Sequence, residues 1–206
     1  GKNRETAFQT MGEARDLFEV EGIGHNLPFL SAVMTHDRFK SGNITTAFIA
    51  EEYPDGFEGV TLSDDDHIAI AAFAAAIDMA EQNRKAELGH TGLGGDVAWM
   101  DQDYVVLVDG KEVPLCISQT TLEEGPQGTH LVSFGESEEE HAIFCDYDPT
   151  EMLTICSAGG LGEGDPNYFL KVQKVAGGYR IRCRGADMQV KVYSQRVAVL
   201  AAMMPE

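Results

Sequence analysis

The sequence predicts an α+β fold in which one long helix is wrapped by antiparallel β-sheet. The first observation is residues 63–88, which have helix end signals and ten consecutive apolar residues in the middle. The second is that helix signals disappear after residue 96, where short strands separated by Gly-rich turns begin. The third is an N-terminal helix–strand–helix pattern of about 50 residues. It is too short to bury both faces of a sheet, so it is typical of the end of a larger α/β domain.

The long helix has clear signals at both ends. Ser63 suits an N-cap, because its hydroxyl can accept a hydrogen bond from a free N–H of the first turn. Three aspartates, 64–66, follow at the positive end of the helix dipole, and Arg84 and Lys85 lie near its negative end. Gly89 is expected to end the helix. At roughly 1.5 Å per residue, its length is about 39 Å.

The middle of this helix carries no polar residue from Ile68 to Ile77. A helix that is apolar all round must be covered all round. Ten residues are too few to cross the roughly 30 Å of a bilayer core. A central helix of a helical bundle is the better explanation of this stretch taken alone. A helix wrapped by sheet is the alternative, which the rest of the chain favours.

The C-terminal half reads as short antiparallel strands. Asp109-Gly110 is a strong two-residue hairpin turn, and Gly177-Gly178 is a second expected turn. Alternation of apolar and polar residues means that one face is buried and the other is solvated, as in a sandwich or barrel. The strands need something to cover, as the apolar helix needs a cover. The expected strands are 105–108, 112–118, 129–134, 141–147, 152–156, 167–175, 179–183 and 188–192.

The N-terminal segment begins with a helix over residues 4–17, whose apolar residues share one face. We expect a short strand at 18–23. A second helix should start at Asn26, with Pro28 in its first turn, and run to residue 34. Residues 41–57 are expected to form a loop, an extended segment and another loop.

Composition limits the classes of function. The net charge of −19 argues against a role centred on nucleic acid, whose phosphates need a basic surface. Neither a transmembrane segment nor a signal peptide is visible, and the missing initiator Met suggests a piece of a longer chain. The four cysteines lie far apart without a CxxC pair, which predicts buried reduced thiols and no zinc site.

No motif in the sequence forms a convincing catalytic constellation. The glycine-rich stretches Gly89–Gly95 and Ala158–Asn167 lack the strand-before, helix-after context of a phosphate loop. The six histidines show no metal-ligand spacing. Basic residues do gather near the C-terminus, where Asp187 is the single acidic residue between Phe169 and Arg196. They are either the solvated face of strands or a docking face for an acidic partner: Lys171, Lys174, Arg180, Arg182, Arg184, Lys191 and Arg196.

Several stretches carry a resemblance to a known family. The run R-x-x-A-x-x-x-M-x-x-A at Arg4–Ala14, with FEVEGIGHNLPFL and RFKSGNITTAFI, resembles the last portion of a biotin carboxylase domain. His25 departs from the Thr that is usual there. EEYPDGFEG at Glu51–Gly59 and AGGYRIRCRGADMQVKVYSQRVA at Ala176–Ala198 resemble α subunits of propionyl-CoA carboxylases. The first 60 residues carry the resemblance most specifically.

This resemblance implies a domain organisation. Residues 1–52 would be the C-terminal remnant of the biotin carboxylase domain, and 53–62 a linker. Residues 63–206 would be the bridging (BT) domain, in which a roughly eight-stranded antiparallel β-barrel at 97–195 surrounds the helix at 63–88.

The resemblance also implies the chemistry of the parent enzyme, an ATP-dependent ligase. That enzyme uses ATP, Mg and bicarbonate to carboxylate biotin, which carries the carboxyl group to an acyl-CoA. The catalytic residues would lie upstream of Gly1 and the biotinyl A-M-K-M motif downstream, so this chain alone is expected to be inactive and to hold no cofactor. Thr46 and Ala47 match positions near the adenine of ATP in an intact domain.

The implied partners are the carboxyltransferase β subunit and the biotin carboxyl carrier domain of the same chain. By resemblance, the linker after the helix grips the β subunit through His90, Thr91, Gly92, Leu93 and Gly94. The basic residues Arg180, Arg182 and Arg184 are the second candidate contact. The cytoplasm of a bacterium or the mitochondrial matrix is the implied location. A methylcrotonyl-CoA carboxylase fragment and an independent ligand-binding barrel remain the alternatives.

Overall fold

The computed structural model describes residues 1–18, 20, 22–90, 103–119, 128–135, 137, 139–159 and 167–203, apart from the side chains of 87–90, 119 and 202. The chain divides into two compact units. The first contains Gly1–Leu62 and Arg182–Asp187, and the second contains Ser63–Ile181 and Met188–Glu206. Within the described residues, no helix has the length and apolarity needed to cross a bilayer.

Short helices make up residues 1–62. The first, α1, covers the predicted range, and the Asn3 side chain caps it by accepting a hydrogen bond from Thr6 N–H at 2.8 Å. The second begins directly after Asn26, as predicted, although the Asn26 side chain makes no capping hydrogen bond. The four helices are α1 (Arg4–Leu17), α2 (Leu27–Thr35), α3 (Asp37–Ser41) and α4 (Phe48–Glu52).

Two sequence-based predictions for this segment are wrong. The described residues between 18 and 23 form no strand. Phe18 and Ile23 are 59% and 72% exposed, which shows that no sheet covers them. The segment expected to be extended contains α4 instead, because a turn held by the Thr45 hydroxyl starts a helix there: Ala47 N–H donates to Thr45 Oγ1 at 3.2 Å.

The long helix α5 spans Asp64–His90. Its start is the predicted one: the Ser63 hydroxyl accepts from Asp66 N–H at 3.1 Å, and the Asp66 carboxylate accepts from Ser63 N–H. Its end is not, because the helix continues through Gly89. A glycine permits the left-handed cap that ends many helices but does not impose it.

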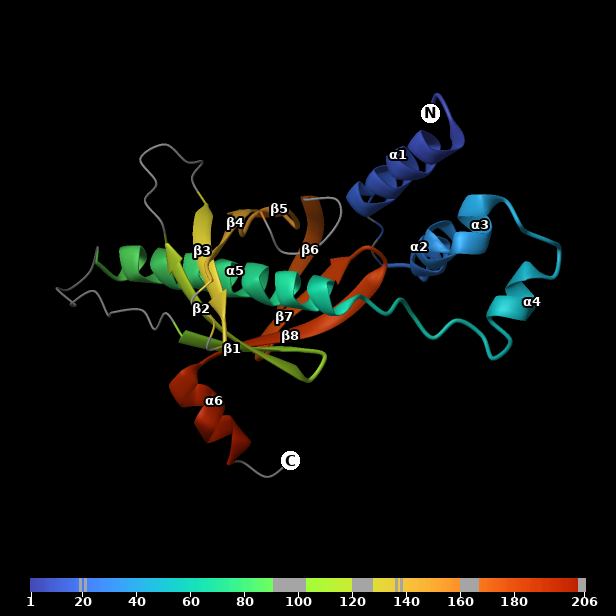
Figure 1. Ribbon diagram of the computed structural model, residues 1–206. Coiled ribbons are helices and arrows are strands. Elements are labelled where there is room, and N and C mark those ends of the chain that lie inside the picture. Colours follow the sequence, from blue (N-terminus) through green and yellow to red (C-terminus); the bar gives the residue numbers. More distant parts are fainter. Residues whose placement is uncertain are drawn as a thin grey trace. The chain divides into compact units, whose positions relative to one another are not determined.

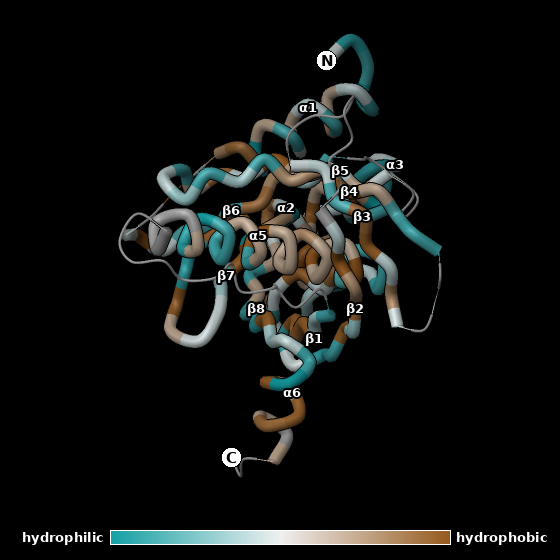
Figure 2. The backbone as a smooth tube through the Cα atoms, turned by 90° about the vertical axis from the view of Figure 1, so that its left-hand side faces the viewer, coloured by the Kyte–Doolittle hydropathy of each residue, from teal (hydrophilic) through white to brown (hydrophobic). Residues whose placement is uncertain are grey.

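Eight antiparallel strands close into a barrel, as expected, and neighbouring strands follow one another in the order of the sequence. Figure 1 shows α5 running through this barrel, and Figure 2, viewed nearly along the helix, shows the strands on all sides of it. The strands are β1 (Asp103–Val108), β2 (Lys111–Gln119), β3 (Thr129–Phe134), β4 (His141–Asp146), β5 (Leu153–Gly159), β6 (Asn167–Val175), β7 (Gly178–Cys183) and β8 (Ala186–Ser194). The predicted barrel start near residue 97 lies outside the described residues.

The inner face of the barrel and the middle of α5 bury one another. All residues of α5 from Ala69 to Ile77 are at most 1% exposed, while Ile68 is half-buried. Phe73 packs against Tyr168 of β6 with ring centroids 5.2 Å apart. In β7 the apolar residues are buried and the arginines between them face outward, as the alternation predicted. The wrapped helix is therefore confirmed and the helical bundle is excluded.

The turn between β1 and β2 is the predicted hairpin. Asp109 and Gly110 both have positive φ, of 50° and 83°, which a two-residue turn of this kind requires. A further helix that the sequence analysis missed, α6 (Gln195–Ala202), packs against β1. Three of its apolar residues are exposed, Val197, Val199 and Leu200, and so is Met203, which directly follows the helix.

Candidate functional site

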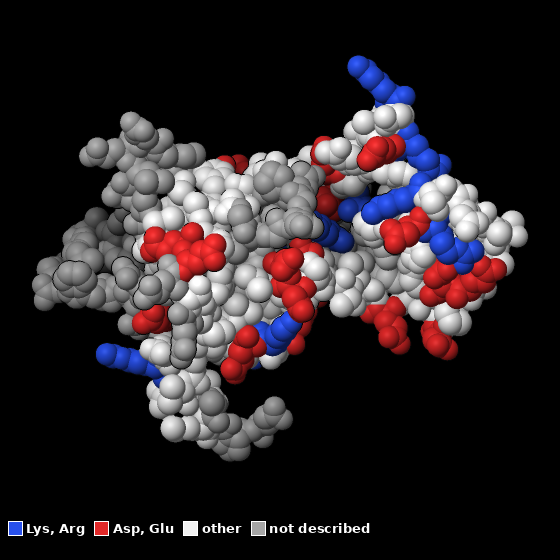
Figure 3. Space-filling model, in the orientation of Figure 1, with Lys and Arg blue, Asp and Glu red and all other residues white. Residues whose placement is uncertain are grey.

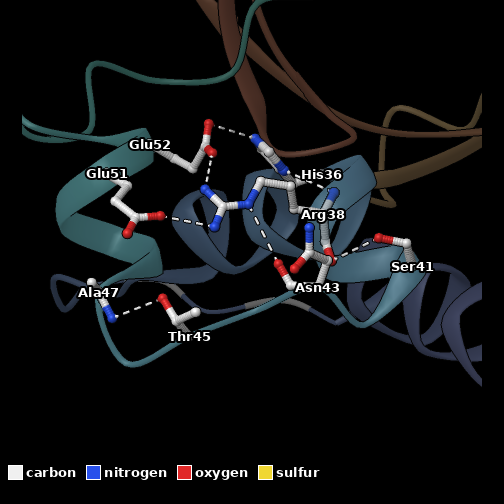
Figure 4. A network of polar contacts seen from close by, with 8 residues as sticks. All are labelled: His36, Arg38, Ser41, Asn43, Thr45, Ala47, Glu51 and Glu52. Atoms are coloured by element: carbon white, nitrogen blue, oxygen red, sulfur yellow. Dashed lines mark hydrogen bonds and ion pairs between the residues drawn. The ribbon is translucent and has the colours of Figure 1, made fainter.

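A network of charged side chains connects α3 and α4. Arg38 donates from Nη2 to Glu51 Oε2 at 2.8 Å and from Nη1 to Glu52 Oε1, so one guanidinium bridges two neighbouring carboxylates. His36 Nε2 lies 3.2 Å from the second oxygen of Glu52. Figure 4 shows these side chains converging from the two helices. The network therefore fixes the short turn that joins α3 to α4.

Electrostatics agree with this geometry. Hydrogen bonding to Arg38 holds the pKa of the Glu52 carboxyl below its ordinary value, and the two glutamates raise the pKa of Arg38. Arg38 also lies over the ring of Phe48, with its Cζ atom 5.5 Å from the ring centroid. Phe48 is 5% exposed and anchors α4. Charge pairing and ring packing thus act on the same turn.

Thr46 and Ala47, the predicted adenine-edge residues, lie in this turn immediately before α4, and both are exposed. The structure therefore places them together on a surface that the Arg38 network supports. Sequence reasoning missed the network itself. Arg38 and the two glutamates are 13 and 14 positions apart, a separation without helical or strand periodicity.

A second polar cluster surrounds the C-terminal part of α5. Tyr179 Oη donates to Asp78 at 3.0 Å, and Tyr147 Oη donates to Glu81 at 3.1 Å. Lys174 Nζ contacts the other Glu81 oxygen at 2.7 Å. Burial raises the pKa of Tyr147 to about 12 and raises that of Tyr179 as well, and the nearby carboxylates act in the same direction. This cluster joins the helix to β6, β7 and the end of β4.

The predicted partner-binding residues fall in two places. His90 is the last residue of α5, while Thr91, Gly92, Leu93 and Gly94 lie outside the described residues. Two of the candidate arginines, 180 and 182, are on the outer face of β7, and the third, Arg184, occupies the turn before β8 with φ of 49°. All three arginines make interactions within the described chain.

Some of the basic side chains of the barrel are paired with acidic side chains of the same chain. Lys174 is paired with Glu81, and a second lysine of the barrel, Lys111, is paired with Asp64 at the start of α5. On the face drawn in Figure 3, basic and acidic side chains are interspersed among the described residues. The same residues include no group of three or more His, Cys, Asp or Glu side chains that could hold a metal ion.

Comparison with known families gives a direct result for the barrel unit. Residues 70–206 match the family model of the propionyl-coenzyme A carboxylase BT domain. The chain belongs to this family. Residues 1–51 match the biotin carboxylase C-terminal domain. Two matches in this order agree with the resemblance derived from the residues.

Individual relatives agree with the family matches, one over nearly the whole chain and others over parts of it. Over 207 aligned residues and 98% of this chain, it is 43% identical to the propionyl-CoA carboxylase α chain of Ruegeria pomeroyi. It is 41% identical to the mitochondrial propionyl-CoA carboxylase α chain of Caenorhabditis elegans over 38% of this chain. It is 44% identical to the biotin carboxylase of Halalkalibacterium halodurans over 22% of this chain. The aligned regions span 28%, 11% and 10% of those proteins.

Proposed function

We propose that the BT unit of this chain is an assembly module, which ties a biotin carboxylase domain to the carboxyltransferase β subunit of a propionyl-CoA carboxylase. The observation that carries the proposal is the filled barrel. Side chains of α5 occupy the interior, where residues such as Phe73, Ile70 and Ile77 are completely buried. Small barrels that bind ligands keep an internal cavity open for them. This filled interior argues against the alternative of an independent ligand-binding barrel. Binding of a partner would therefore take place on the outer surface.

The proposed parent activity is that of a biotin-dependent ligase acting on propionyl-CoA. The names of the relatives support propionyl-CoA over methylcrotonyl-CoA as the substrate. The proposed location is the bacterial cytoplasm or the mitochondrial matrix. The biotin carboxyl carrier domain is the second proposed partner, because it must visit both active sites that the module holds together.

We propose that this chain by itself binds no ATP, Mg or biotin. Around the turn at Thr46 and Ala47, the guanidinium of Arg38 is engaged by two glutamates and is not available to a phosphate. No described acidic cluster could hold Mg²⁺. The sequence contains no A-M-K-M motif for biotin. The proposal gives this chain alone no catalytic step, and Thr46 and Ala47 would contact adenine only within an intact biotin carboxylase domain.

The proposed contact with the β subunit is the segment from His90 to Gly94. Glycine-rich backbone allows a partner to approach closely, because it carries few side chains. Its position directly after a helix fixed inside a barrel would give the segment a rigid base. Loops on rigid scaffolds are common sites of recognition. The second candidate contact is the arginine set 180, 182 and 184, which would complement an acidic partner surface.

The decisive experiment is size-exclusion chromatography of the chain with a purified carboxyltransferase β subunit. We expect co-elution of the unmodified chain and its loss when 90–94 is exchanged for an unrelated linker of equal length. Exchange of 161–165, in the other glycine-rich segment, is the matched control and should leave binding intact. Circular dichroism checks that all variants fold. If the unmodified, folded chain does not co-elute, the assembly function is wrong.

A further inference from the structure

Two cysteines face one another inside the barrel. Cys145 of β4 and Cys156 of β5 are direct cross-strand partners in the sheet register. Both side chains point inward and are 6% and 0% exposed. Their sulfur atoms lie 3.3 Å apart, and both cysteines are in the reduced state. The structure thus brings two reduced thiols into direct contact, although they are eleven positions apart in the sequence.

Backbone hydrogen bonds show that Cys145 and Cys156 form a non-hydrogen-bonded cross-strand pair, the type in which the two residues lie closer together. Cys145 N–H donates to Gly128 O at 3.0 Å, on the β3 side of its strand. In antiparallel sheet, the N–H and C=O of one residue point to the same neighbouring strand. Cys145 therefore exchanges no backbone hydrogen bonds with Cys156. Non-hydrogen-bonded pairs have Cα atoms about 4.5 Å apart, within the span that a disulfide covers without backbone movement.

The residue opposite Cys145 holds this arrangement in place. A Cβ atom added at Gly128 would lie 2.5 Å from Cys145 O, and Gly128 has φ of 96°. A side chain there would push β4 away from β3. The glycine therefore keeps Cys145 at its present depth and facing β5.

The other two cysteines provide an internal comparison. Cys116 lies on the outer face of β2 and is half-buried, and burial raises the pKa of its thiol. Cys183 is buried at the end of β7, two strands away from β5 in the barrel order. Buried single cysteines commonly act as small hydrophobic residues. The contact between two sulfur atoms separates Cys145 and Cys156 from that case.

We propose that Cys145 and Cys156 form a reversible dithiol–disulfide site, which hydrogen peroxide oxidises to a single intrachain disulfide. This site is independent of the assembly function proposed above. Deprotonated Cys145 attacks one peroxide oxygen, the O–O bond breaks, and the departing hydroxide takes a proton and leaves as water. Deprotonated Cys156 then attacks the sulfenic sulfur, the S–S bond forms, and a second water leaves. Two thiols lose two electrons and two protons, and the peroxide is reduced to two waters.

Burial sets the kinetics of this site. Peroxide reaches the sulfur atoms only when the β4–β5 hairpin opens locally, so oxidation is slow under native conditions. The product crosslinks the hairpin and opposes further opening, because a disulfide restricts the unfolded chain. We expect the oxidised barrel to unfold at a temperature roughly 4–8 °C higher than the reduced one. A small dithiol such as dithiothreitol should reverse the shift.

The test maps the disulfide in the folded 206-residue chain. The chain is treated with hydrogen peroxide, which catalase then removes, and remaining thiols are blocked with N-ethylmaleimide in guanidinium chloride. Digestion after glutamate separates the two cysteines at Glu151, whereas trypsin leaves both in one peptide. We expect mass spectrometry to find a crosslinked pair containing Cys145 and Cys156, sensitive to dithiothreitol. Cys116 and Cys183 should carry the blocking group.

Variants make the result specific. Cys145→Ala and Cys156→Ala should each abolish the crosslink and the thermal shift, while the buried control Cys183→Ala keeps both. The map of the unmodified chain decides the question even if one alanine variant fails to fold. Four blocked thiols after oxidation would overturn the proposal. Crosslinks to Cys116 or Cys183, or a disulfide that forms only after denaturation, would overturn it equally.

Discussion

Tyrosine hydroxyls fasten both ends of the buried stretch of α5 to the barrel. Tyr168 Oη donates to Asp66 at 3.1 Å before the apolar run, and Tyr179 donates to Asp78 just after it. A third tyrosine, Tyr147, reaches Glu81 one turn further on. Each hydrogen bond to a carboxylate is of the charge-assisted kind, which is stronger than one between neutral groups. Apolar packing fills the barrel, and these bonds define how far the helix is inserted.

The raised pKa of Tyr147 predicts a loss of stability in alkaline solution. Its pKa is about 12 in the folded protein, against an ordinary value near 10. The neutral hydroxyl is favoured by folding, so its contribution is complete below about pH 10 and is lost as the pH rises through about 12. Near pH 8, we expect the unmodified chain to unfold at a higher urea midpoint than the Tyr147→Phe variant. The difference between the two midpoints should shrink as the pH approaches 12.

The control for this titration lies in the same pair of proteins. Between about pH 7 and pH 8 neither the folded nor the unfolded tyrosine titrates, so the difference in midpoint should be constant there. A difference that also stays constant from pH 10 to pH 12 would contradict the assigned role of Tyr147.

At the scale of elements, the helix and the barrel are interdependent. Six of the ten residues from Ile68 to Ile77 are alanines. Small side chains let the barrel strands approach the helix closely on every side. Ala74 is completely buried in this stretch, so an added side chain has no solvent to reach. Charge at this position would be left without water or a partner.

Replacement of Ala74 by glutamate should therefore prevent the barrel from folding, because a buried unpaired carboxylate is far too costly. Ala74→Leu is the graded version, in which overpacking should cost about 1–3 kcal/mol. Ala7→Glu, at an exposed position of α1, is the matched control and should stay within about 0.5 kcal/mol. Urea unfolding followed by circular dichroism measures all three. Cooperative unfolding of Ala74→Glu near the wild-type midpoint would refute the packing argument.

Helices and strands were predicted correctly where the local sequence carried a clear periodic pattern. The strand over 129–134 was predicted to the residue, and β7 was found from strict alternation. The short helix α4 was missed, because five residues carry too little periodicity to separate a helix from an extended segment. The strand expected at 18–23 was wrong, because apolar alternation says nothing about whether a partner strand exists.

The polar contacts could not be predicted for a different reason. The pairing of Tyr179 with Asp78 joins residues 101 positions apart, and it exists only once the barrel register is set. Arg38 and Glu52 are only 14 positions apart, but they meet only once the turn between α3 and α4 has formed. Sequence pattern located the residues that fill the barrel, since burial leaves a periodic trace. Single hydrogen bonds across the fold leave none.

At the scale of the whole molecule, the hydrophobic core is unevenly divided. The completely buried large side chains of the described residues lie in α5 and the strands: Phe73, Ile70, Ile77, Ile117, Ile143, Leu170, Ile181 and Met188. Among the described residues of Gly1–Leu62, Phe48 is the one buried hydrophobic side chain. Met11, Leu17, Leu30 and Ile49 are all more than 40% exposed. The two segments should therefore differ in their ability to fold alone.

We predict that residues 63–206 expressed alone retain the cooperative urea transition of the barrel, because the helix and all eight strands lie within that range. Residues 1–62 alone should show no cooperative transition, since a chain of that length needs most of its apolar residues buried to offset conformational entropy. Circular dichroism and urea titration of both pieces test this and the proposed linker at 53–62 together. A cooperative transition in 1–62, or an unfolded 63–206, would show that the two segments depend on one another for stability.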